Sequence, residues 1–159
     1  MGLHEVSAIL WRERNLLELL LFKLEEEQLV LAAGRSRWLA HATREVEAVL
    51  DRIKDAELAR SMEVDAAAPG LLLRPGASLR ELAEAAPAPW GPMFEEHRQA
   101  FLELTEEIVA VANANKELLA RGAQAVRDTL SFVADRQKDD TYGFTGATER
   151  RPLVLDEAI

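Results

Sequence analysis

The chain contains no cysteine, and this absence excludes several kinds of site at once. A disulfide scaffold, a thiolate nucleophile, an iron–sulfur cluster and a cysteine-based zinc site all require that residue. Basic side chains are also few: 19 Lys and Arg stand against 28 Asp and Glu, which gives a net charge of -9. A nucleic-acid binder needs a basic face to neutralise phosphates, so this charge argues against one.

Long apolar runs and targeting segments are missing as well. The densest apolar run, residues 16–24, includes Glu18 and Lys23 and is about half the ~20 residues that a membrane span needs. The N-terminal residues have no basic region and no cleavage site, so we expect a cytoplasmic protein without stable membrane insertion. Five of the six prolines lie within residues 63–92, which leaves the remaining chain free to form long helices.

Apolar residues recur with 3–4 spacing in three long segments, as amphipathic helices require. In the first segment, residues 3–33, only Glu13 and Glu27 interrupt the apolar stripe, and Gly34 is the expected left-handed stop. The second segment, residues 37–62, follows Ser36, which we predict as its N-cap. The joint between them is short, so the two helices should form an antiparallel hairpin.

The third segment, residues 93–134, has the most regular spacing in the chain. Twelve positions step by three or four residues without a slip: Phe94, His97, Phe101, Leu104, Ile108, Val111, Asn115, Leu118, Gly122, Ala125, Thr129 and Phe132. Most of them are apolar, which places a long helix here. A polar Asn115 in such a stripe fixes the register or pairs with a polar group on a neighbouring helix.

The connection before the third segment contains one further helix signal. Ser78 and Glu81 form a capping box that predicts a short helix over residues 79–86. We expect residues 71–73, three leucines, to pin the connection to one end of the bundle, with a disordered linker as the alternative. The sequence therefore predicts an all-α fold: a coiled-coil-like three-helix bundle over residues 1–134 and a flexible C-terminal tail over residues 135–159.

No group of residues suggests catalysis. The three histidines, His4, His41 and His97, are far apart in the sequence, and no serine has the context of a nucleophile elbow. His41 and Glu45 lie four residues apart, which is half of a metal site or a solvated ion pair. We predict that the protein is not an enzyme and needs no cofactor, with a metal-dependent enzyme built on His41 as the alternative.

The third helix carries more apolar surface than a three-helix core should cover. A second series with 3–4 spacing runs beside the first: Val109, Ala112, Lys116, Leu119, Ala123, Val126, Leu130 and Val133. Small residues in the second half of this helix allow another helix to approach closely, and helix-in-groove recognition uses such surfaces. The alternative is that both series are buried within the bundle or in a homodimer.

Several of these features resemble the FlgN family of flagellar type III export chaperones. The run at residues 113–119, Asn-Ala-Asn-Lys-Glu-Leu-Leu, followed by Thr141, Tyr142 and Gly143, is similar to the C-terminal half of that family. The leucine-rich first helix, the acidic residues 25–27 and the short helix opened by Ser78 are similar to its N-terminal half and connecting helix. The resemblance covers nearly the whole chain.

The resemblance implies a cytosolic chaperone that binds the C-terminal segment of hook–filament junction proteins and delivers it to the export gate. It implies that the C-terminal helix takes the cargo and that a tail tyrosine, here Tyr142, contacts the cytoplasmic domain of the gate. The cargo-binding residues that we expect are Val109, Ala112, Asn115, Leu119, Val126, Leu130 and Val133. The alternative function is a structural helical bundle whose second apolar series serves only homo-oligomerisation, for example in a homodimer.

Overall fold

The computed structural model describes residues 2–137, and these residues form helices and connections without a strand. The elements are α1 (Gly2–Ala32), α2 (Ser36–Ala67), a short 3-10 helix η1 (Ala68–Leu71), α3 (Leu79–Ala85) and α4 (Trp90–Gln137). The predicted all-α class is confirmed, as are the hairpin, the longer third helix and the short extra helix. None of the described helices is long and apolar enough to span a membrane.

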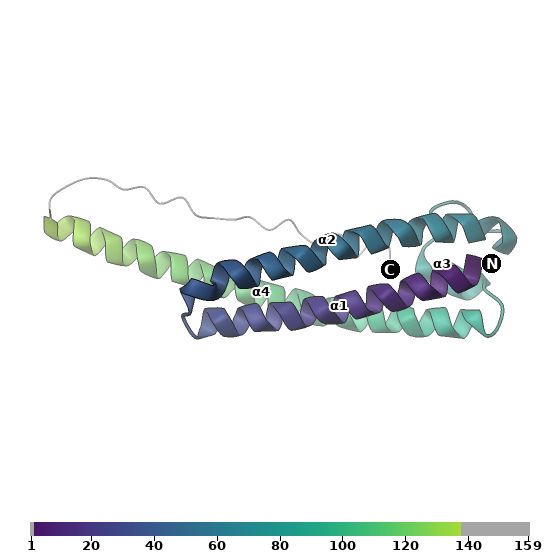
Figure 1. Cartoon of the computed structure of the whole chain (residues 1–159), viewed down its shortest axis with the longest axis horizontal. Helices are drawn as coiled ribbons and strands as arrows, with labels where there is room; N and C mark the ends of the chain where they lie inside the picture. Colours follow the sequence, from purple (N-terminus) through teal and green to yellow (C-terminus); the bar gives the residue numbers. More distant parts are fainter. Residues whose placement is uncertain (1, 138–159) are drawn as a thin grey trace.

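Helix α1 is the central element of the bundle. It packs along α2 on one side and along α4 on the other, while α3 packs against the beginning of α4. Figure 1 shows that α1 and α2 are antiparallel and that α4 continues well past the hairpin turn. The core is mainly leucine, valine and phenylalanine from the inward faces of these helices, including Leu10, Leu17, Val46, Ile53, Leu82, Phe94, Phe101 and Ile108.

The hairpin turn depends on Gly34. This residue has a φ of 65°, a left-handed conformation that glycine adopts without steric cost, as predicted. The prediction that Ser36 caps α2 is wrong, because Ser36 is already the first helical residue and Arg35 precedes it without a side-chain cap. In the turn the N–H of Ser36 donates to the carbonyl oxygen of Gly34 (3.0 Å), and Arg35 between them has φ -83° and ψ 62° instead of the extended conformation of a capping residue.

Two helices are longer than their sequence patterns indicate. Helix α2 continues to Ala67 rather than ending near Met62, because Val64 is buried and the alanines that follow are strong helix formers up to Pro69. Helix α4 begins at Trp90 rather than Met93. Pro92 is tolerated there because a proline in the first helical turn removes an N–H that has no partner within the helix.

The connection between α2 and α4 is ordered by a few buried contacts. Leu71 and Leu73 pack against the core, whereas Leu72, expected to help them, is 95 % exposed in a left-handed conformation. The capping box is confirmed, since the Ser78 hydroxyl accepts from the N–H of Glu81 and the Glu81 carboxylate accepts from the N–H of Ser78. The predicted tail, residues 135–159, falls almost wholly outside the described residues, and α4 itself extends to Gln137.

Candidate functional site: the projecting end of α4

One face of α4 points toward α1, and along the helix it changes from buried to exposed. Phe94, Phe101 and Ile108 on this face are at most 1 % exposed. Steps of three and four residues carry the same face onward through Asn115 to Val126 and beyond. Because α1 ends at residue 32 while α4 continues to residue 137, the far part of this face has no covering helix within residues 2–137 (Figure 1).

The uncovered part forms a continuous apolar strip, which we call the exposed stripe. Every residue from 120 to 134 is exposed, and the large apolar side chains on this face of α4 show about half of their surface: Val126 50 %, Leu130 48 % and Val133 43 %. The stripe comprises Leu119, Gly122, Ala123, Val126, Leu130 and Val133. It extends about 20 Å along the axis, at 1.5 Å per residue.

Polar side chains beside and opposite the exposed stripe make contacts between successive turns of the projecting end. Arg121 donates to Glu117 (2.6 Å), Gln124 donates to Asp128 (2.7 Å) and Arg127 donates to Gln124 (3.0 Å). Such pairs add only about 0.2–0.5 kcal/mol each to an isolated helix. A helix of this length without tertiary contacts is only marginally stable in water, so a partner on the exposed stripe would also stabilise the helix itself.

A buried polar layer marks the point where α4 leaves α1. The Asn115 amide donates to the Leu24 carbonyl oxygen (2.8 Å) and to the Glu27 carboxylate (3.1 Å), and the Thr43 hydroxyl of α2 donates to the same carboxylate (3.2 Å). Asn115 and Glu27 are both 0 % exposed. The layer therefore joins all three long helices one turn or so before α1 ends at Ala32.

The predicted cargo residues do not all lie on the exposed stripe. Val126, Leu130 and Val133 lie on it, with the half-buried Leu119 at its inner end. Val109, 44 % exposed, and the half-buried Ala112 lie earlier, where α4 still packs against α1. Asn115 requires a correction: it is completely buried and bonded within the bundle, so its side chain is not available to a partner. Tyr142 lies outside the described residues.

Sequence patterns also missed two buried carboxylates on α1. Glu13 and Glu27 interrupt the apolar stripe in sequence, yet they are 3 % and 0 % exposed. Glu13 forms an ion pair with Arg60 of α2 (3.0 Å), while Glu27 belongs to the polar layer. Their inward positions in the 3–4 spacing were the available signal, because a charged residue at such a position needs a partner on a neighbouring helix.

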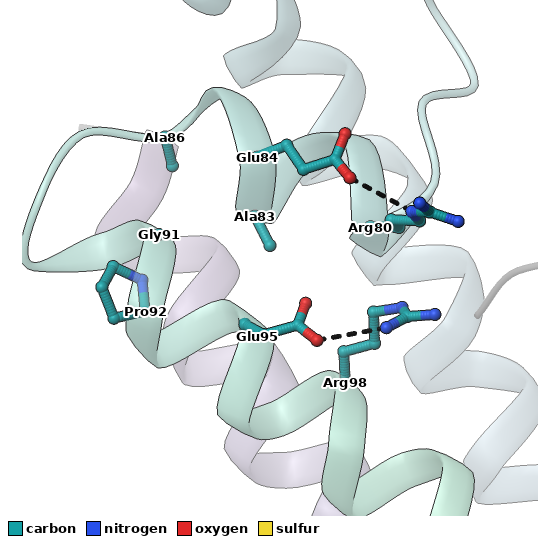
Figure 2. A pocket seen from close by; sticks show the side chains of 8 residues that line it. All are labelled: Arg80, Ala83, Glu84, Ala86, Gly91, Pro92, Glu95 and Arg98. Atoms are coloured by element: carbon teal, nitrogen blue, oxygen red, sulfur yellow. Dashed lines mark hydrogen bonds and ion pairs between the residues drawn. The ribbon is translucent and has the colours of Figure 1, made fainter.

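Figure 2 shows a shallow hollow between α3 and the first turns of α4. Its charged side chains already pair with each other: Arg80 with Glu84 (3.1 Å) and Arg98 with Glu95 (3.1 Å). A hydrogen bond from Gln99, together with Arg98, holds the pKa of Glu95 below its usual value. Because both arginines are neutralised locally, the hollow offers little to a charged ligand.

The metal-site candidate that the sequence offered, His41 with Glu45, is not assembled in the described residues. Among residues 2–137, no three His, Asp or Glu side chains lie close enough together to hold a metal ion. His41 stacks on Trp38 and contacts Arg44, while Glu45 pairs with Lys23, so the predicted His41–Glu45 pair is not formed. His97 is buried edge-on against Trp11, and burial lowers its pKa.

Within residues 2–137 the bundle leaves one apolar helix face uncovered, which is typical of the class of proteins that bind a partner helix. The comparison with protein families makes this class specific: the model of the FlgN protein family matches residues 1–150, and the chain belongs to that family. FlgN proteins are chaperones of flagellum biogenesis and not a family of enzymes. No curated protein and no solved structure is significantly similar to the chain.

Proposed function

We propose that the exposed stripe binds the C-terminal helical segment of hook–filament junction proteins in the cytoplasm before their export. One observation carries the proposal: the apolar face of α4 extends beyond the end of α1, the helix that covers the first half of this face. An amphipathic segment that becomes helical on binding would take the place of α1 there. Burying each Leu-sized side chain contributes about 1.5–3 kcal/mol, so four or five anchors offset the cost of ordering the segment.

The chaperone action that follows needs no covalent chemistry. A bound segment cannot associate with other junction proteins, because its apolar residues are covered. Release and delivery at the export gate then require a second contact, which we assign to Tyr142 through an aromatic ring and a hydroxyl that suit a weak, reversible interface. Tyr142→Ala should leave cargo affinity unchanged and weaken binding to the cytoplasmic domain of the gate; a loss of cargo affinity would contradict this division of roles.

The cargo surface is tested with charged substitutions on the exposed stripe. Val126→Asp and Leu130→Asp should each weaken binding of a purified junction-protein C-terminal segment at least about tenfold, because a carboxylate would be buried without a partner. Leu58→Asp is the matched control, since Leu58 lies on α2 and is 65 % exposed. Far-ultraviolet circular dichroism confirms that each variant is folded. Unchanged affinity in folded stripe variants would reject this surface.

The second candidate is a bundle that uses the exposed stripe only for self-association. The same exposure of Val126, Leu130 and Val133 favours it, because a second copy could also cover these side chains. Sedimentation at low micromolar concentration separates the two functions. An obligate dimer that is disrupted by Leu130→Asp leaves no free face for cargo, whereas a monomer that binds the junction segment supports the chaperone.

A further inference from the structure

The charges around the exposed stripe point to a specific kind of helix. We propose that the stripe selects a partner helix whose apolar residues are bordered by acidic side chains. This inference rests on the proposed function, because it names the chemistry of the partner at the same surface. It follows from how positive and negative side chains are distributed around the projecting end of α4.

Two of the three cations lie on a different side of this helix from the carboxylates, whereas Arg121 lies beside Glu117. Lys116 and Arg127 are eleven residues apart, which is close to three full turns, so they share one side of α4, at the border of the stripe. Glu117 and Asp128 are also eleven residues apart and share the side that faces away from the stripe. A helix that lies along the stripe therefore passes beside two cations and no carboxylate from this set.

The carboxylates are also engaged, whereas the bordering cations are available. Glu117 accepts from Arg121 (2.6 Å), and Asp128 accepts from the amide of Gln124 (2.7 Å). Within residues 2–137 the one hydrogen bond of the Arg127 side chain goes to the amide oxygen of Gln124 (3.0 Å), and neither Arg127 nor Lys116 forms an ion pair there. Both cations are exposed, so both can pair with a carboxylate from another molecule.

This distribution is the reverse of the chain as a whole. Residues 116–134 contain three cations (Lys116, Arg121 and Arg127) and two carboxylates, a balance of +1 in a protein with a net charge of -9. Charges that border an apolar helix face set partner choice and orientation in paired helices. They also act against a second copy in an antiparallel pair, because that arrangement brings the same basic border of both copies together.

Two synthetic peptides of identical composition test the inference. Each is an amphipathic helix of about 20 residues with one leucine stripe at 3–4 spacing, long enough to cover the exposed stripe. In the first peptide glutamates border the leucines and lysines lie on the far face; in the second the two residue types are exchanged. Equal net charge removes any general attraction or repulsion, so a difference in Kd reports only the position of the charges.

We expect the full-length protein to bind the glutamate-bordered peptide roughly fivefold more tightly, which corresponds to two exposed ion pairs. High salt should remove the preference, and K116E/R127E should reverse it. R52E/K54E, the same change of charge at two exposed positions on α2, should keep it. Equal binding of both peptides, or tighter binding of the lysine-bordered peptide, would contradict the proposed selection of an acidic border. Neither result would contradict the proposed binding of cargo at the exposed stripe. Failure to bind either peptide would reject both.

Discussion

The buried amide of Asn115 donates a hydrogen bond to the buried carboxylate of Glu27 across the interface between α4 and α1 (3.1 Å). Apolar residues with 3–4 spacing continue along α4 on both sides of this contact. Hydrophobic packing alone would therefore tolerate a shift of α4 along α1 by one repeat. The hydrogen bond distinguishes the observed register, because a shift of α4 takes the buried Asn115 amide away from both of its acceptors and removes one donor from the Glu27 carboxylate.

Asn115→Ala should destabilise the protein by about 1–3 kcal/mol, because it removes one donor to the Glu27 carboxylate inside the bundle. Asn113→Ala is the control: the same substitution two residues earlier, at an exposed position, should change stability by less than about 0.5 kcal/mol. Chemical denaturation monitored by circular dichroism measures both. Equal stability of the two variants would show that the polar layer contributes nothing.

Gly91→Ala should separate α3 from α4. A β-carbon at residue 91 would lie 2.7 Å from the carbonyl oxygen of Ala86 and 2.9 Å from that of Ala83, closer than real contacts allow. Relief requires a backbone shift, so we expect a loss of about 1–3 kcal/mol. Thermal or urea denaturation tests this, and a variant as stable as the wild type would mean that the packing between α3 and α4 adjusts freely.

Gly122→Ala should have the opposite effect. Apart from its chain neighbours and the backbone of its own helix turn, no atom lies within 4 Å of the position that its β-carbon would take, and the residue is inside the projecting part of α4. Replacing glycine by alanine in a helix interior stabilises the helix by about 0.5–1 kcal/mol. Hydrogen exchange of residues 119–134 should slow, while exchange in α1 and α2 stays the same. Faster exchange in this segment would contradict the prediction.

Glu13 should make stability depend on pH. Burial raises the pKa of Glu13 from its ordinary value of 4.5 to about 7, against the opposing effect of the Arg60 guanidinium. Between these two pH values the native state keeps a proton that the unfolded state releases. The contribution of Glu13 is therefore fully present below pH 4.5 and is lost as the pH rises through about 7.

Glu13→Gln isolates this effect. The difference in unfolding free energy between the wild type and the variant should fall as the pH rises across that window. Comparing the two proteins removes the contribution of His97, whose pKa is lowered by burial and which makes stability fall toward low pH. Urea denaturation at a series of pH values measures the difference. A difference that does not change with pH would show that Glu13 stays ionised in the native state.

Local patterns predicted the helices because the signals act over neighbouring residues. The 3–4 spacing of apolar residues, the left-handed Gly34 and the capping box of Ser78 each depend on only a few positions along the chain. Two of the helix bounds differ where a contact distant in sequence contributes, whereas the wrong cap at Ser36 came from the local geometry of the turn. Helix α2 continues to Ala67 because Val64 is buried, and α4 can begin at Trp90 because Gly91 lets α3 approach closely.

The amino-acid sequence by itself determined the all-α class, the antiparallel hairpin, the long third helix and the resemblance to FlgN proteins, which the family comparison confirmed. Only the tertiary structure decided which apolar residues of α4 stay exposed. Periodicity assigns a residue to a face of a helix, but not to a covered or an uncovered length of that face. Whether a residue of this face is covered depends on where α1 ends relative to α4. The contact between Asn115 and Glu27 fixes the position of the end of α1 along α4.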